Sequence, residues 1–175
     1  MKDQLLTISE TLKYARHDFM NQLQLIRMNL DLGRLDEAKK VIENYSDDAR
    51  KLFELTKIEL PKTSDWLQTV SWRYPALPTK IQCTNAYPIH EKYDDSIVEL
   101  LEKIFFNVNE RIDPFRDYKI KIEIDSTAND FNFEIKLMGE LNHMIIEKLM
   151  DEHGLLKTSN EFYSPTEWQF SIKAR

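Results

Sequence analysis

Residues 5–33 read LLTISETLKYARHDFMNQLQLIRMNLDLG. Apolar side chains recur along this stretch in steps of three and four, the spacing of one continuous stripe on an α-helix. No Pro or Gly interrupts the stripe, and Gly33 then supplies the left-handed residue that commonly ends a helix. The pattern predicts a long helix over residues 3–32, with a stripe formed by Leu5, Ile8, Leu12, Ala15, Phe19, Leu23, Ile26 and Leu30.

A second apolar stripe follows Gly33 and predicts a second helix that ends before Pro61. The connection at residues 33–34 is short, so we expect the two helices to form an antiparallel hairpin. Two long helices leave much apolar surface uncovered, and we therefore expect two copies to pair as a dimeric four-helix bundle. The alternative is that the stripe packs on the C-terminal part of the same chain. The second stripe consists of Leu35, Ala38, Val41, Ile42, Tyr45, Ala49, Leu52 and Leu55.

The remainder of the chain has a mixed pattern of helices and strands. We expect an α+β protein with two domains, a helical hairpin at residues 1–60 and an α/β sandwich at residues 61–175. In the sandwich, the apolar residues Ile97, Leu100, Leu101, Ile104, Phe105 and Val108 mark the inner face of its main helix. The predicted elements of this domain are helices at 65–72, 94–112 and 140–150, and strands at 80–86, 118–125, 131–137 and 168–172.

Composition excludes several classes of function. The 175 residues carry a net charge of −6 without a long basic run, which argues against nucleic acid as a partner. The apolar stretches are too short to span a membrane, and the N-terminus lacks the apolar core of a signal peptide. Cys83 is the only cysteine, so neither a disulfide framework nor a thiolate metal cluster is expected. These features predict a cytoplasmic protein without a bound metal.

The residue of the hairpin that is best suited to take part in a reaction is His17. With Leu5 at heptad position a, His17 falls at f, which points away from the apolar seam. An exposed imidazole is largely unprotonated at neutral pH, and a rigid helix suits phosphoryl transfer, which depends on positioning and charge stabilisation. Asp18 can accept a hydrogen bond from one ring nitrogen, and Lys13 and Arg16 can offset negative charge. Spacing alone also permits an ordinary surface histidine.

Residues 17–26 form the pattern H-D-x-x-N-x-L-x-x-I, which resembles the phosphoacceptor box of two-component histidine kinases. Together with residues 30–42, the stretch resembles the sporulation initiation phosphotransferase B family of Bacillus-type phosphorelays. The resemblance covers the whole chain in architecture, whereas its specific motif is confined to residues 16–26. It implies that His17 is the phosphohistidine of a homodimeric phosphotransferase. Such a protein takes phosphoryl from the aspartate of one response regulator and passes it to a second, DNA-binding regulator in sporulation control.

The same reading assigns roles to other residues of the first helix. Asp18, Asn21, Arg16 and Lys13 are expected to support the transfer. The expected docking surface for the receiver domains consists of Met20, Gln22, Gln24 and Leu25. No cofactor is expected in this chain, and Mg²⁺ is expected on the partner regulator. Either ring nitrogen could take the phosphoryl group, and the C-terminal domain could stabilise the bundle or contact the regulators.

An ATP-dependent autokinase is not expected. Its nucleotide loops need closely spaced glycines, and the second domain has only Gly139 and Gly154. Arg111 also stands four places after Asn107, where the kinase Asn-box that this helix resembles would carry its metal-holding Asn. A further alternative is a non-catalytic dimeric binding protein that sequesters response regulators or a sensor kinase.

Overall fold

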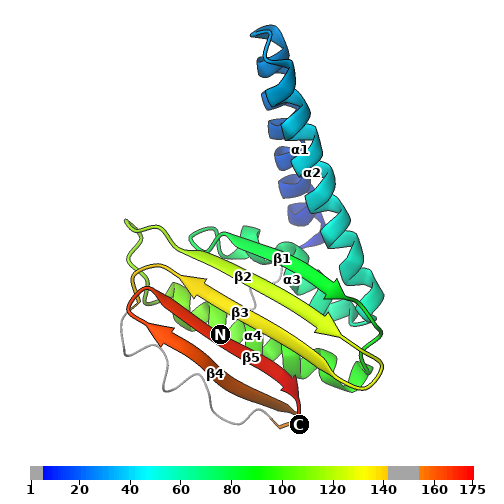
Figure 1. The fold of residues 1–175 in the computed structure, drawn as a ribbon, viewed down its shortest axis with the longest axis vertical. Coiled ribbons are helices and arrows are strands. Elements are labelled where there is room, and N and C mark those ends of the chain that lie inside the picture. The colour runs from blue at the N-terminus through cyan, green and yellow to red at the C-terminus, as the bar shows by residue number, and fades with distance from the viewer. Residues whose placement is uncertain (1–5, 142–153) are drawn as a thin grey trace. The chain divides into compact units, whose positions relative to one another are not determined.

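The computed structural model of the protein describes residues 6–141 and 154–175. The chain divides into two compact units, the hairpin unit of residues 1–53 and the α/β unit of residues 54–175. The elements, in chain order (Figure 1), are α1 (Ile8–Asp31), α2 (Leu35–Glu54), the 3-10 turn η1 (Leu55–Ile58), α3 (Pro61–Arg73), β1 (Thr79–Asn85), the 3-10 turn η2 (Glu91–Tyr93), α4 (Asp94–Asn109), β2 (Lys119–Ser126), β3 (Phe131–Met138), β4 (Leu156–Ser164) and β5 (Glu167–Ala174).

Helix α1 is closed at both ends by local interactions. At its start, the Thr7 hydroxyl accepts a hydrogen bond from the Glu10 backbone N–H, and the Glu10 carboxylate accepts one from the Thr7 N–H, which is a capping box. At its end, Gly33 has a φ of 70°, and the Arg34 N–H donates to the Asn29 carbonyl at 2.8 Å. This turn is the helix termination that the glycine predicted.

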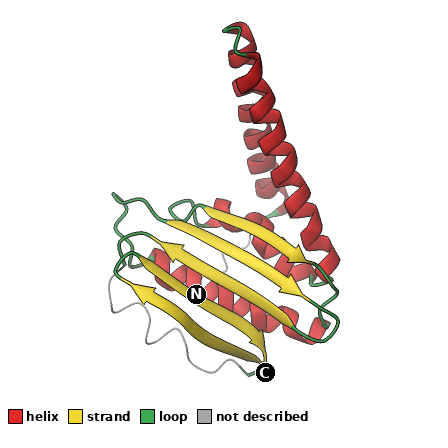
Figure 2. Cartoon of the chain, in the orientation of Figure 1, coloured by secondary structure: helices red, strands yellow, loops and turns green. Residues whose placement is uncertain are grey.

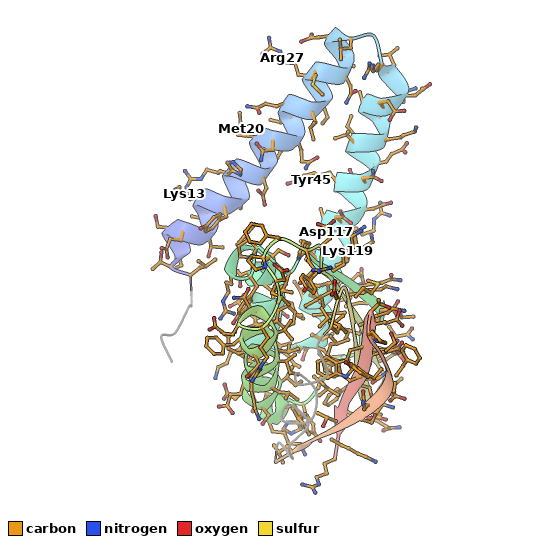
Figure 3. All side chains as sticks on the ribbon, turned by 90° about the vertical axis from the view of Figure 1, so that its left-hand side faces the viewer. Lys13, Met20, Arg27, Tyr45, Asp117 and Lys119 are labelled. Carbon is orange, nitrogen blue, oxygen red and sulfur yellow. The ribbon has the colours of Figure 1, made fainter. Side chains whose placement is uncertain are left out.

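The two helices of the hairpin unit run antiparallel from this turn and diverge away from it (Figure 3). Tyr45 projects from α2 toward α1, where its ring centroid lies 6.5 Å from that of Phe19. Both helices lie wholly within the described residues, and only Asn29 and Ala38 in them are buried. The predicted hairpin is confirmed, but it does not by itself bury its apolar side chains.

The α/β unit contains a five-stranded sheet with the order β1-β2-β3-β5-β4. Strands β1 and β2 are parallel, and the other neighbouring strands are antiparallel. Helices α3 and α4 lie behind this sheet and cover one of its faces (Figure 2). The α+β class is confirmed, and the apolar residues predicted for the inner face of α4 are all buried, namely Ile97, Leu100, Leu101, Ile104, Phe105 and Val108.

Helix α3 begins differently from the prediction, which used Pro61 as the end of the preceding helix and began the next helix at residue 65. Pro61 is instead the first residue of α3, a position at which its missing N–H costs nothing. The next backbone N–H groups, those of Lys62 and Thr63, donate to the buried Asp94 carboxylate at 3.0 and 2.8 Å. The cap of α3 therefore comes from the start of α4, a distant part of the chain.

Glu102 joins helices α3 and α4 of the α/β unit. Its carboxylate accepts hydrogen bonds from Trp66 Nε1 at 2.6 Å, from the Tyr74 hydroxyl at 2.7 Å and from Arg73 Nη2 at 2.7 Å. Burial is the main cause that raises the pKa of the Tyr74 hydroxyl, followed by its bond to Glu102. These hydrogen bonds of the Glu102 carboxylate link α3 to α4.

Two further differences from the prediction concern the boundary between the units and one strand. The division between the units lies before residue 60, because Leu55, Ile58 and Leu60 are buried in the α/β core. Strand β4 was not predicted from the sequence. The predicted helix at 140–150 lies mostly outside the described residues. Within the described part of the chain, no helix is long and apolar enough to cross a membrane.

Candidate phosphoacceptor site

His17 lies near the middle of α1, and its side chain is 69% exposed. The ring therefore points outward, as its heptad position predicted. Lys13 and Asn21 stand one helical turn before and after it, and both are exposed. Lys13 and Met20 extend from the side of α1 that faces away from α2 (Figure 3). A protein partner can reach the imidazole from this side without unfolding the helix.

Two side chains of α1 contact one atom of the imidazole. Asp18 Oδ1 and Asn21 Nδ2 each lie 3.3 Å from His17 Nδ1. Asp18 comes directly after His17, and Asn21 is one turn further along the helix. Both contacts are made to Nδ1, so neither of them uses the other ring nitrogen, Nε2.

The predicted supporting cations, Lys13 and Arg16, are both close to His17 in sequence but lie on different sides of the helix. Lys13 shares the face of His17. Arg16 is exposed and lies about 100° around the helix from His17. Either side chain is long enough to move toward a phosphoryl group that arrives on the ring.

The predicted docking residues do not all lie together. Met20, Gln24 and Leu25 are exposed. Gln22 is half-buried and lies about 140° around the helix from His17. It belongs to the least exposed row of α1, which comprises Thr11, Ala15, Asp18, Gln22, Ile26 and Asn29. The structure therefore brings Gln24 and Leu25 toward the face of His17 and turns Gln22 away from it.

Two apolar side chains beside His17 were not singled out from the sequence. Tyr14, three residues before it, and Met28, eleven residues after it, fall on the same face, and they are 40% and 50% exposed. The helical repeat counted from His17 would have found both. The outer face of α1 therefore carries apolar groups in addition to those of the predicted seam.

A separate row of apolar side chains, called here the exposed stripe, runs along another side of α1. It belongs to the stripe predicted from the sequence, and in the single chain it faces solvent. Its members are Ile8, Leu12, Phe19, Leu23 and Leu30. A row of this length on a helix that buries almost nothing is typical of an interaction surface, whereas isolated exposed apolar residues are common on any protein.

The helix in the α/β unit that resembles a kinase Asn-box has its polar groups occupied internally. Asn107 Nδ2 donates to the Lys103 carbonyl at 2.7 Å, and its Oδ1 accepts from Arg111 Nη1 at 2.8 Å. These contacts run along the surface of α4. Asn107 and Arg111, which occupy the positions of the kinase Asn-box, therefore bind each other and the backbone of their own helix.

Comparisons with known proteins agree with this arrangement. Residues 1–58 match the family described as the alpha-helical domain of SpoOB-type sensor kinases. The hairpin is therefore similar to the helical domain of SpoOB-type sensor kinases, and it carries an outward histidine. The chain is 29% identical over 94 residues to sporulation initiation phosphotransferase B of Bacillus subtilis strain 168, a match that covers 54% of this chain and about half, 49%, of that relative. The resemblance seen in the sequence is confirmed: this chain is similar to sporulation initiation phosphotransferase B.

Matches among solved structures include a bacterial phosphotransferase and the histidine kinase domain of a blue-light-activated kinase from Erythrobacter litoralis. The first is 15% identical with a TM-score of 0.41, and the match covers 96% of this chain and 98% of the other. The second is 10% identical with a TM-score of 0.48, and the match covers 95% and 94% of the two chains.

Proposed function

We propose that the protein is a histidine phosphotransferase of a phosphorelay in sporulation control, with His17 as the phosphoryl carrier. The observation that supports this most strongly is the exposed imidazole on a rigid helix, with Asp18 Oδ1 3.3 Å from its Nδ1. His17 accepts phosphoryl from the aspartate of one response regulator. It then passes the group to the aspartate of a second, DNA-binding regulator.

The chemistry follows from the position of the ring. When Nδ1 carries the ring hydrogen and donates it to Asp18, Nε2 holds a free electron pair. This pair attacks the phosphorus of the receiver's aspartyl phosphate, a P–N bond forms, and the P–O bond breaks with its electrons going to the aspartate carboxylate. The positive charge that appears on the ring is stabilised by Asp18. The receiver supplies Mg²⁺, and Lys13 and Arg16 offset charge on the moving phosphoryl group.

The active species is proposed to be a homodimer. Helix α2 also has exposed apolar side chains, among them Leu35 and Ile42, which are 60% and 49% exposed. Pairing two hairpins would cover these side chains and complete a four-helix bundle. His17 would remain outside the bundle, because it lies roughly opposite the stripe on the helix.

The phosphoryl group is proposed to arrive already activated, rather than from ATP bound to this chain. The contacts of Asn107 with Lys103 and Arg111 support this view, because they use the polar groups that a nucleotide-bound metal would need. The α/β unit then serves as a scaffold or as an additional contact for the regulators.

The test is a transfer assay with a phosphorylated receiver domain from the same organism. Wild-type protein should gain an acid-labile label, and His17→Gln should gain none. His90→Gln is the matched control, because His90 is also exposed and lies in the α/β unit. A wild-type protein that binds the receiver without gaining label would support the non-catalytic binding protein instead. Labelling by ATP alone would indicate an autokinase.

A further inference from the structure

The two contacts at His17 Nδ1 compete with each other. Asp18 is an acceptor, so its contact requires a hydrogen on Nδ1, whereas the Asn21 amide N–H is a donor and requires a free electron pair there. One nitrogen of a neutral imidazole cannot satisfy both at once. The two 3.3 Å contacts therefore belong to two different tautomers of the same ring.

These tautomers differ at the reactive atom. With the hydrogen on Nδ1, the Asp18 bond forms and Nε2 has a free electron pair. With the hydrogen on Nε2, the Asn21 bond forms and Nε2 has no pair with which to attack. We propose that Asn21 is a positioning residue that opposes Asp18, holding a fraction of His17 in the tautomer that cannot take phosphoryl on Nε2.

Helix geometry makes the competition an intrinsic property of α1. Asp18 is adjacent to His17, and Asn21 is one turn away, so both reach Nδ1 without a contribution from another element. A hydrogen bond to a carboxylate is roughly twice as strong as one between neutral groups. The Asp18-bound tautomer is therefore the major one, and Asn21 maintains the minor one.

The inference concerns the resting ring, and it rests on the proposed function only for its consequence for transfer. Once phosphoryl is on Nε2, Nδ1 keeps its hydrogen and its bond to Asp18, and Asn21 has no electron pair to contact. Asn21 therefore acts on phosphoryl uptake and not on the stability of the phosphohistidine.

The first test measures the tautomers directly in the isolated protein. In ¹⁵N-labelled protein, long-range ¹H–¹⁵N spectra at neutral pH report how much hydrogen resides on each nitrogen of His17. Asn21→Leu removes the donor and should raise the Nδ1–H population, whereas Asp18→Asn should lower it. Asn44→Leu is the matched control, since it makes the same change at an exposed position of α2 and should leave the populations unchanged.

The second test measures uptake from phosphoramidate, a small phosphodonor that needs no receiver. Nε2 attacks phosphorus, the P–N bond of the donor breaks, and ammonia leaves with a proton from water. The rate for Asn21→Leu should rise above wild type by the same factor as its Nδ1–H population. Circular dichroism checks that each variant keeps its helices.

The outcomes separate this inference from the proposed function. Unchanged tautomer populations in Asn21→Leu would overturn the inference, even if His17 exchanges phosphoryl with a receiver. A changed population with an unchanged or slower rate would also overturn it, because the tautomer would not limit uptake. If the Nδ1–H population and the uptake rate rise together in Asn21→Leu while no receiver donates phosphoryl, the inference stands and the proposed relay function fails.

Discussion

The two units of this protein use the same apolar periodicity with opposite results. In the α/β unit, Phe105, Phe133 and Phe170 are completely buried, whereas in the hairpin unit Phe19 is 48% exposed and Ile8 is 81% exposed. The α/β unit therefore closes around its own core. The hairpin unit has the side chains of a core without the surface that would cover them. Periodicity shows which residues become buried, but it does not show whether the burying surface is in the same chain.

The largest effect should follow from a charge placed in the exposed stripe. Phe19→Glu is expected to prevent hairpin pairing, because an unpaired carboxylate would be buried at the centre of the apolar seam. Sedimentation velocity should show a dimer for wild type and a monomer for the variant. Phe115→Glu, at a position 96% exposed in the α/β unit, is the control and should remain dimeric. A monomeric wild type, or a dimeric Phe19→Glu, would contradict the proposed bundle.

The second effect should be confined to the α/β unit. Phe105 packs edge-on against Trp66 at 4.9 Å between centroids and is completely buried, so Phe105→Ala should cost about 3–5 kcal/mol of unfolding free energy. All three tryptophans belong to this unit, and their fluorescence in a urea titration reports its unfolding. Dissociation of the dimer by this substitution would show that the units are not independent.

A smaller effect tests the long-range cap of α3. Asp94→Ala removes the acceptor of the Lys62 and Thr63 N–H groups and should cost about 2 kcal/mol in the same titration. Asp94→Asn keeps one of the two capping oxygens and should retain part of the stability. Equal losses in the two variants would mean that the charge of Asp94, rather than its capping bonds, stabilises this end of the helix.

The smallest effect concerns the start of α1. Hydrogen bonds from the Thr7 N–H and hydroxyl hold the pKa of the Glu10 carboxyl below its ordinary value. The capping box thus stabilises α1 above the unfolded-state pKa of Glu10, and this contribution is lost as pH falls through its folded-state pKa. The protection factors of the amides in the first turn, which correct for the intrinsic pH dependence of exchange, should fall over that window. In Glu10→Gln this acid-dependent loss of protection should disappear.

Particular elements show how far the sequence alone could lead. The inner face of α4 was predicted residue by residue, because a helix against a sheet has a strong periodic signal. Strand β4 was missed because it is an edge strand with polar residues at Lys157, Ser159 and Glu161, and because a register shift between Asn160 and Phe162 breaks its alternation. The role of Pro61 was misread because its helix is capped by Asp94, and no local pattern reveals a distant cap.

At the candidate site, the heptad placed His17 outward correctly, and the sequence also indicated that Asp18 could reach the ring. It did not reveal that Asn21 shares the same nitrogen, because the competition depends on side-chain rotamers and not on spacing. It also placed Gln22 in the docking surface, whereas the structure turns this side chain to the least exposed row of α1. The roles of these residues in docking stay predictions.

The most direct measurement is the location of the phosphoryl group after incubation with a phosphorylated receiver. The protein is digested under alkaline conditions, which preserve phosphohistidine, and its peptides are sequenced by mass spectrometry. We expect a single phosphorylated peptide, with the group on His17, and none from the other histidines. Phosphate on another residue, or its absence from a protein that has discharged the receiver, would contradict the account.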